Sequence, residues 1–259
     1  TCDMLIAPPN EVGDTRVRGI CGQVDGSIIP GMIGMEAGQS AYGDIYSWFR
    51  DLLLWPGQLI VGSELIDPQA AEALVQEMSD RLIPALSEAS AEIPIGESGI
   101  CAVDWLNGRR TPDANQALQG ALPGLQLGSD APRIFRALVE ATAFGGKAIV
   151  DRFIAEGVPI KEVIAIGGVA RKSPFAMQVL ADVLNMEIKV ARSDQTVALG
   201  AAMFAAVVGG VFDTIVDAQA VMGCGIETVY HPIAENVARY RPLYKAYQKV
   251  GAFIETELT

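Results

Sequence analysis

A strand–turn–helix unit in the second half of the chain limits the fold more than any other segment. The apolar run EVIAI (162–166) is short enough for a buried strand, and the glycine pair Gly167–Gly168 follows it directly. The next segment (173–184) opens with Ser-Pro, which is typical of a helix start. A second strand, EIKVA (187–191), and a helix of small residues that can pack closely (195–210) complete the unit. Strands that alternate with helices in this way predict an α/β domain.

The glycine pair matches neither common nucleotide-binding loop. A P-loop needs G-x-x-x-x-G-K-[ST], but Arg171 stands where the second glycine belongs, before Lys172 and Ser173. The dinucleotide fingerprint G-x-G-x-x-G is absent as well. A turn between a strand and a capped helix still binds ligands in open α/β sheets, because glycines admit a ligand and the helix start offers free N–H groups. We expect Arg171 and Lys172 to add flexible polar reach there; an ordinary tight turn is the alternative.

Composition and charge exclude several classes of protein. Half of the 259 residues are hydrophobic, which predicts a sizeable core and argues against disorder. The formal net charge of −12 argues against a nucleic-acid partner, because such proteins carry a basic face. The apolar stretches are too short, or too interrupted by glycine and charge, to span a membrane.

The cysteines and the single histidine bear on compartment and chemistry. Cys2, Cys21, Cys101 and Cys224 are far apart in sequence and form no C-x-x-C pair, and the chain opens without the basic segment of a signal peptide. We therefore expect reduced, mostly buried thiols in a cytoplasmic protein. His231, the only histidine, precedes a proline and is interpreted as a loop residue. One histidine leaves too few ligands for an ordinary zinc site and argues against Ser-His-Asp catalysis.

The remaining segments predict strands near the N-terminus and long helices after it. We expect a strand in CDMLIA (2–7) and a hairpin in 17–34 with Asp25–Gly26 as its two-residue turn. GICAVDWLNGRRTP (99–112) predicts a strand followed by an Asn-Gly turn. A first helix has Ile45, Trp48, Phe49, Leu52 and Leu53 on one side and should end at Pro56. Other helices are predicted at 68–91, bent or interrupted near Pro84, at 129–157 with Ser129 or Asp130 as N-cap, and at 238–255 with Tyr240, Tyr244 and Tyr247 at helical spacing.

Several long segments together resemble the C-terminal domain of the FGGY carbohydrate kinases, and most of all the bacterial L-ribulokinase branch of that family. The resemblance implies an α/β domain of the actin-like ATPase (ribonuclease-H-like) fold, a mixed sheet flanked by helices. In this family two such domains enclose a nucleotide cleft. The matching segments are TCDMLIA, GICGQVDGSIIPGMIGMEAGQSAYGDIYSWF, VDWLNGRRTPDANQ, EATAFGGKAIVDRF and GGVARKSPFAMQVLADVLNMEIKVARSDQTVALGAAMFAAV.

The same resemblance implies which residues contact the nucleotide. Gly167 and Gly168 match the adenosine motif, with Gly168 close to the adenine or ribose, and Lys172 stands at another nucleotide-contacting position. Gly43 and Ser47 match positions that line the nucleotide pocket. From the residues alone, Gly43 would be a close helix contact and Ser47 a solvated helix residue.

Further matches concern a phosphate loop and the hinge between the two domains. Thr1 matches the end of the second phosphate loop, and the helix around Gly200 resembles a hinge helix that packs without touching the ligand. The first phosphate loop, most sugar contacts and the aspartate general base belong to an N-terminal domain of the family. We therefore expect residues 1–259 to be the C-terminal nucleotide-binding domain of a longer kinase, without a catalytic residue or a metal ligand of its own.

The expected reaction is transfer of the γ-phosphoryl group of ATP, with Mg²⁺, to the 5-hydroxyl of L-ribulose in arabinose catabolism. Glu36, in GMEAGQS, is either a turn or capping group or a cleft residue that accepts hydrogen bonds from the sugar hydroxyls. Two other functions stay open: a kinase of this family for another pentulose or pentitol, and a non-catalytic actin-like ATP-binding module. The expected partners are a small sugar, ATP and the N-terminal domain, and a homo-oligomer is also open.

Overall fold

Residues 3–258 are described by a computed structural model, and their strands form two three-stranded sheets. In the first sheet β3 (Ile33–Ala37) lies between β1 (Asp3–Ala7) and β2 (Gly22–Asp25) and is antiparallel to both. In the second, β5 (Ile188–Ala191) is parallel to β4 (Val163–Ala165) and antiparallel to β6 (Ile226–Tyr230). The parallel β4–β5 pair confirms the predicted strand–helix–strand unit.

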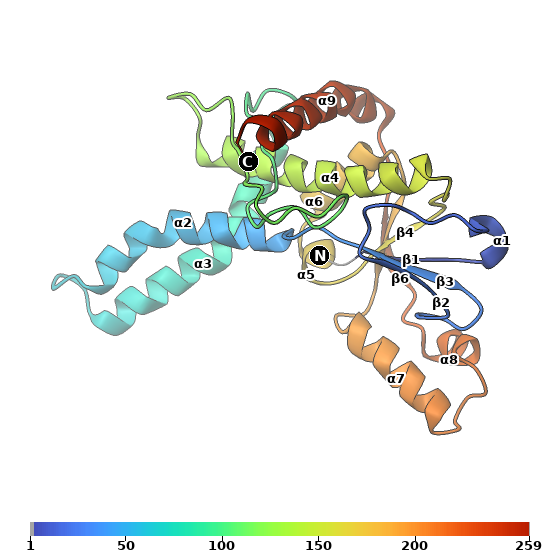
Figure 1. Ribbon diagram of the computed structural model, residues 1–259. Helices are drawn as coiled ribbons and strands as arrows, with labels where there is room; N and C mark the ends of the chain where they lie inside the picture. The colour runs from blue at the N-terminus through green and yellow to red at the C-terminus, as the bar shows by residue number, and fades with distance from the viewer. Residues whose placement is uncertain (1–2, 259) are drawn as a thin grey trace.

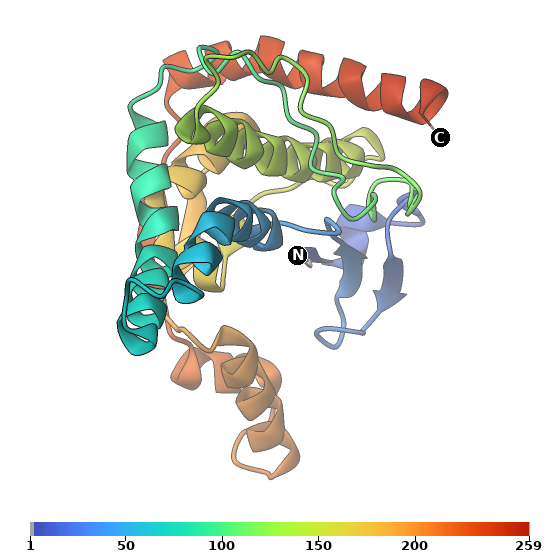
Figure 2. The same ribbon diagram turned by 90° about the vertical axis from the view of Figure 1, so that its left-hand side faces the viewer.

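Helices make up most of the rest of the described chain (Figure 1), and α6 packs against one face of the second sheet. In Figure 2 helix α9 crosses one end of the molecule, while α7 and α8 stand apart at the other. The helices are α1 (Pro9–Val12), α2 (Gly43–Val61), α3 (Pro68–Ala91), α4 (Ala131–Ala155), α5 (Gly168–Lys172), α6 (Pro174–Leu184), α7 (Thr196–Val208), α8 (Ile215–Met222) and α9 (Ala234–Glu257). None of those in residues 3–258 combines the length and apolar character needed to cross a membrane.

Helix α4 is the centre of the main core. Its N-cap is Asp130, whose side chain accepts a hydrogen bond from the Arg133 N–H at 3.0 Å, and Gly157 follows its end with a φ of +85°. Its apolar side chains are largely buried, with Leu138 and Phe153 at 1% and 3% exposure. Tyr240, Tyr244 and Tyr247 lie in one helix, α9, as predicted; they are buried and all pack their rings against Phe144 of α4.

A buried ion pair on α4 ties three helices together. Arg136 Nε lies 2.9 Å from Glu140 Oε1, and both side chains are almost fully buried. The same guanidinium donates to the Ser90 carbonyl of α3 at 2.8 Å and to the Tyr240 hydroxyl of α9 at 3.2 Å. Burial raises the pKa of the Glu140 carboxyl to about 7, although the attraction of Arg136 opposes the shift. Such a pair fixes geometry more than it adds net stability.

The structure differs from two predictions near the N-terminus. The β2–β3 hairpin lacks a two-residue turn: Asp25 pairs with Ile33, and the Gly26 N–H donates to the Met32 carbonyl at 2.8 Å. The longer loop folds back over Gly34, where Ser27 and Ile28 fill the space that a side chain would need. Helix α2 also does not end at Pro56 but continues to Val61, and this part of it packs along α3, with Gly57 close to Val75.

Segment 99–112 is not a strand. Only isolated bridges form there: Val103 with Ala121, Leu106 with Gly108 and Arg109 with Asn115. Asn107 makes the predicted turn. Side-chain hydrogen bonds to helices hold this segment in place, instead of backbone hydrogen bonds to a neighbouring strand. The predicted burial of β4 is also wrong on one face: Val163 and Ala165 pack against the main core, whereas Ile164, which points to the other face, is 53% exposed.

Three smaller predictions have mixed outcomes. His231 lies in a loop as predicted, with Nδ1 2.9 Å from Glu187 Oε1. Cys2 lies outside the described residues; Cys21 is exposed, and Cys101 and Cys224 are half-buried, so none of these three is the buried thiol expected. Helix α7 does not pack closely through its small residues: it meets α8 in a small core of its own, formed by Met203, Ile215 and Ala218.

Candidate nucleotide-binding site

The glycine pair forms an open turn at the carboxyl end of β4. Gly167 has a φ of +86°, a conformation that glycine adopts at little cost, and it is the N-cap of α5. A Cβ placed on Gly168 would meet no heavy atom within 4 Å, so the space above this residue is open. The helix that follows is the short α5, which the sequence did not predict. Ser173 ends it and then caps α6, accepting a hydrogen bond from the Ala176 N–H at 3.2 Å.

The start of α2 lies against this turn. A Cβ on Gly43 would come within 2.9 Å of Val169 Cγ2, so the absence of a side chain at Gly43 lets α2 and α5 approach closely. Ser47 is one helical turn further along α2 and is half-buried. Residues four apart share one helix face, so Ser47 lies on the same side as Gly43. The structure thus brings Gly43, at the start of α2, beside the β4–α5 turn, and Ser47 follows one turn further along the same helix.

The two cations after the turn differ in their surroundings. The expected flexibility of Arg171 is wrong, because its side chain is held by two carboxylates. It is paired with Asp194 and with Glu227, whose Oε2 lies 3.2 Å from the Arg171 Nε. Lys172 is exposed and lines a groove of about 750 Å³ between α3, α6 and α9, which the glycines do not line. Lys172 is therefore at the edge of the turn rather than over it. Thr1, the remaining predicted nucleotide contact, lies outside the described residues.

Glu36 is held by an arginine that the sequence did not single out. Its Oε1 accepts a hydrogen bond from Arg110 Nη2 at 2.6 Å, and both side chains are partly exposed. Glu36 stands on β3, opposite Gly22 of β2, while Arg110 comes from the irregular segment 99–112. The position of this carboxylate thus depends on how that segment is fixed.

Segment 99–112 is fixed by a buried carboxylate. Asp104 accepts hydrogen bonds from Tyr247 OH of α9 at 2.7 Å and from Gln39 Nε2 at 2.8 Å, and Gln39 also donates to the Thr142 carbonyl of α4 at 2.9 Å. Burial raises the pKa of the Asp104 carboxyl above its usual range, although both hydrogen bonds oppose the shift. Thr111 Oγ1 accepts from the Gly38 N–H at 3.3 Å, which ties the segment to the end of β3.

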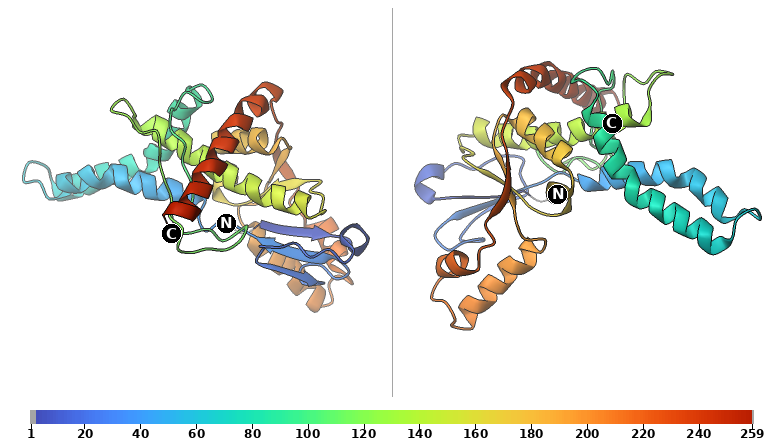
Figure 3. Two further views of the ribbon diagram at one scale, coloured as in Figure 1. Left: turned by 45° about the horizontal axis from the view of Figure 1, so that its top comes forward. Right: turned by 180° about the vertical axis from the view of Figure 1, so that it is seen from behind.

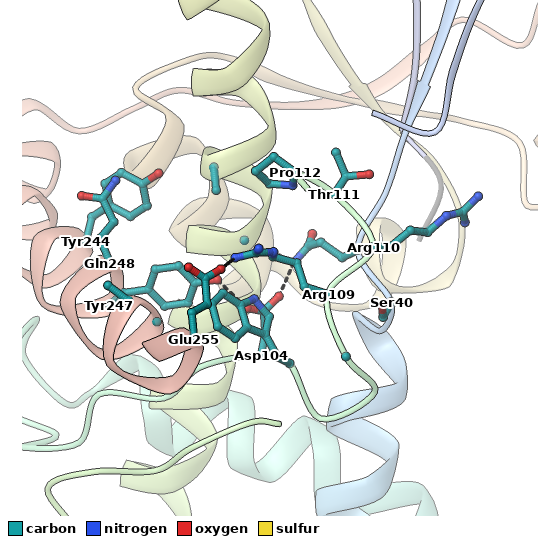
Figure 4. A pocket seen from close by; sticks show the side chains of 17 residues that line it. Ser40, Asp104, Arg109, Arg110, Thr111, Pro112, Tyr244, Tyr247, Gln248 and Glu255 are labelled. Carbon is teal, nitrogen blue, oxygen red and sulfur yellow. Dashed lines mark hydrogen bonds and ion pairs between the residues drawn. The ribbon is translucent and has the colours of Figure 1, made fainter. Parts of the chain in front are cut away.

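A cavity of about 180 Å³ lies beside this network. Figure 4 shows Arg109 meeting Glu255 of α9 there, whereas Arg110 points away from the cavity. The Arg109 guanidinium also lies over the Trp105 ring, 4.8 Å from its centroid. The two neighbouring arginines therefore have separate tasks: Arg109 joins the segment to α9, and Arg110 reaches Glu36.

The sequence carried two signals for this network that periodicity did not reveal. Asp104 interrupts the otherwise apolar run ICAVDWL, and Gly145 interrupts the most regular helix of the chain. The structure explains the glycine, because a Cβ there would overlap Gln39 Nε2 and Asp104 Oδ2. A carboxylate in an apolar run and a glycine in a helix interior are each unfavourable alone, and together they indicate a buried polar contact.

The fold is the actin-like ATPase fold of sugar kinases, as predicted. Solved structures that share it include a gluconate kinase and a ligand-bound xylulose kinase, both from Lactobacillus acidophilus. The TM-scores are 0.73 and 0.74 at 18% and 17% sequence identity, covering 98% and 99% of this chain and 46% of each neighbour.

The sequence comparisons define the family. Residues 1–208 match the model of the FGGY family of carbohydrate kinases, C-terminal domain, and the chain belongs to this family. It is 48% identical over 255 residues to a ribulokinase of Vibrio parahaemolyticus and 41% identical over 258 residues to one of Bacillus licheniformis. These matches cover 98% of this chain but only 44% of each relative, so the chain spans less than half their length. Kinases of this family use ATP and a sugar as substrates.

The glycine at the centre of the Asp104 network gives a direct test of its importance. Gly145→Ala should lower the free energy of unfolding by about 1–3 kcal/mol, because the new methyl group displaces Gln39 and Asp104. Gly146→Ala is the matched control: its Cβ would lie 3.7 Å from Gln39 Oε1 and from Leu180 Cδ1. Alanine is a better helix former than glycine, so the free energy of unfolding of this control should stay the same or rise by up to about 1 kcal/mol. Urea unfolding measures the stability of both variants. An equal loss of stability in the two would show that the close contact at Gly145 does not matter.

Proposed function

We propose that this chain is the nucleotide-binding C-terminal domain of an ATP-dependent kinase that phosphorylates the 5-hydroxyl of L-ribulose in arabinose catabolism. The observation that carries the proposal is the match to ribulokinases, which extends over 98% of the chain at up to 48% identity. The xylulose and gluconate kinases share the fold at 17–18% identity and do not favour another substrate. A sugar-binding domain elsewhere in the intact protein would supply the aspartate base and the first phosphate loop.

The adenosine part of ATP would lie over the β4–α5 turn. The open space above Gly168 lets a ligand approach the backbone. Gly43 is in close contact with Val169, so the start of α2 lies beside this turn. Ser47 would offer a hydroxyl from the same face of α2. Lys172, exposed at the end of α5, would approach the nucleotide from the edge, whereas Arg171 is engaged by Asp194 and Glu227.

The sugar hydroxyls would meet Glu36. An ionised carboxylate has about four acceptor positions, so the hydrogen bond from Arg110 does not exhaust its capacity. Arg110 orients this carboxylate, and the Asp104 network holds the segment that carries Arg110. In this proposal Arg110 is a positioning residue, because it acts through Glu36.

Phosphoryl transfer depends mainly on alignment and on neutralising charge. Closure of the two domains would align the sugar with the γ-phosphoryl group and exclude water. Mg²⁺ would accompany ATP, and its charge would offset that of the phosphates. Across residues 3–258 no three His, Cys, Asp or Glu side chains gather into a metal-binding group, and we assign none of them to the ion.

A valine at Gly168 tests the nucleotide position. Because a Cβ there meets nothing in the protein, Gly168→Val should leave the melting temperature nearly unchanged. It should raise the ATP KM of the intact enzyme at least about tenfold, since a loss of 1.4 kcal/mol is tenfold in affinity, and leave the sugar KM unchanged. Steady-state kinetics with each substrate varied in turn provide the measurement. Equal increases in both KM values would point to misfolding and contradict the placement.

Replacing Glu36 by Gln tests the sugar contact. Loss of a charged acceptor typically costs about 1.5–3 kcal/mol, so the KM for L-ribulose should rise roughly 10- to 150-fold while the ATP KM changes little. The control is Glu162→Gln, the same exchange at a surface ion pair with Lys189. An unchanged ribulose KM in Glu36→Gln would refute the contact, and the Gly168 prediction would be unaffected.

The intact protein and the isolated chain should differ completely in activity. In a coupled ADP-release assay the intact protein should prefer L-ribulose over other pentuloses and pentitols. Residues 1–259 alone should show no turnover, because removal of a general base costs about 10²- to 10⁴-fold and loss of alignment costs more. Ribulose-dependent turnover by the isolated chain near ordinary enzyme rates would show that the catalytic groups have been misplaced.

A further inference from the structure

Helices α7 and α8, with the loop between them, form an arm (residues 196–222) that extends away from the second sheet in the right-hand view of Figure 3. The two helices share a small core of their own, which Ile29 of the β2–β3 loop also touches. Two short connections join this α7–α8 arm to the sheet, residues 192–195 before α7 and residues 223–225 after α8. Because the arm shares so little core with the rest of the chain, its orientation depends on what holds these connections.

The Arg171 guanidinium of α5 reaches the chain at both connections. It is paired with Asp194 of the first connection, and its Nε lies 3.2 Å from Oε2 of Glu227, which follows the second connection in β6. The connections themselves lie side by side, because the Arg192 N–H donates to the Gly225 carbonyl at 3.1 Å. A guanidinium has five N–H donors, so it can hold two carboxylates at once. Arg171 thus bridges α5 to the base of the α7–α8 arm.

An irregularity of the second sheet supplies one of these carboxylates. Two consecutive residues of β5, Val190 and Ala191, pair with Thr228 and Ile226 of β6, so Glu227 between them is the extra residue of a β-bulge. A bulge changes the direction of a side chain relative to the regular alternation of a strand. We therefore interpret this bulge as the feature that turns the carboxylate toward the arginine.

Helix α5 has few other anchors. It has five residues, far fewer than a helix needs to be stable by itself. Its Ala170 is buried in the main core, and Val169 lies against Gly43 at the start of α2. The ion pairs of Arg171 hold the other end of this short helix, whose first residue is Gly168. The position of the glycine turn relative to the rest of the fold therefore depends in part on this arginine.

We propose that Arg171 is a positioning residue that couples the glycine turn to the α7–α8 arm. The inference rests on the proposed nucleotide site at this turn. A nucleotide bound there would fix α5, and α5 carries the guanidinium that holds both connections of the arm. Nucleotide binding therefore restricts the arm without touching it, and loss of the arginine weakens nucleotide binding in return. Exposed ion pairs add little to stability, so removing them changes this coupling more than the fold.

Hydrogen–deuterium exchange of the intact protein, with and without saturating Mg-ADP, tests the coupling. In the wild type Mg-ADP should slow exchange both at the turn (167–170) and at the base of the arm (192–200). In Arg171→Gln the turn should still be protected, whereas the base of the arm should not. Asp194→Asn should give the same pattern although it leaves α5 unchanged, because it breaks the link on the side of the arm. The control is Arg81→Gln, which removes an ion pair with Glu77 on α3 and should behave as the wild type.

Steady-state kinetics give a second readout that a loss of stability alone would not produce. Arg171→Gln should raise the ATP KM roughly fivefold or more, a size typical of coupling between two sites, and leave the sugar KM unchanged. Arg171→Lys should raise the ATP KM less, because lysine keeps the charge but lacks the planar fork that holds two carboxylates.

Three results would overturn the proposal. Protection of the turn without protection of the arm in the wild type would refute the coupling and leave the nucleotide site in place. Protection of the arm that persists in Arg171→Gln would show that another contact carries the effect. A wild type in which Mg-ADP protects neither segment would refute the nucleotide site itself, and this inference with it.

Discussion

The buried carboxylate of Asp104 is the interaction on which the candidate sugar site depends. It joins a segment without regular structure to α9 through Tyr247 and, through Gln39, to α4. A buried carboxylate is costly unless its hydrogen bonds are made, so the segment has few alternative positions once the helices are packed. The position of Arg110, and through it that of Glu36, follows from this constraint. The irregular backbone of 99–112 is thus fixed by side chains on two helices.

The charge of the chain bears on which part of ATP the proposed site would hold. A protein with a net charge of −12 attracts a polyanion poorly, and Arg171, one of the two cations beside the glycine turn, is neutralised by Asp194 and Glu227. The turn itself offers an open glycine backbone, which suits the uncharged base and ribose. This division supports the proposal that the chain holds the adenosine, while Mg²⁺ and the rest of the intact protein hold the phosphates.

Local patterns predicted the elements well and their long-range contacts poorly. Hydrophobic periodicity and helix caps are local properties of a sequence. They predicted the β4–α6–β5 unit, the capped helix α4 and the tyrosine face of α9. The course of α2 past Pro56 and the loop over Gly34 depend on contacts with distant segments, which override the local signals. The glycine pair 167–168 followed from the strand–turn–helix pattern, whereas Gly43, Ser47 and Glu36 were found through the family resemblance. Their neighbours Val169 and Arg110 became visible only in the fold, because nothing in a single sequence states which residues meet.

The central proposal is that the face formed by the start of α2 and the β4–α5 turn binds the nucleotide. The most direct measurement is hydrogen–deuterium exchange of the intact protein with and without saturating Mg-ADP. The account predicts slowed exchange in residues 43–47 and 167–172. Protection confined to the groove between α3, α6 and α9, or to the cavity beside Asp104, would contradict it.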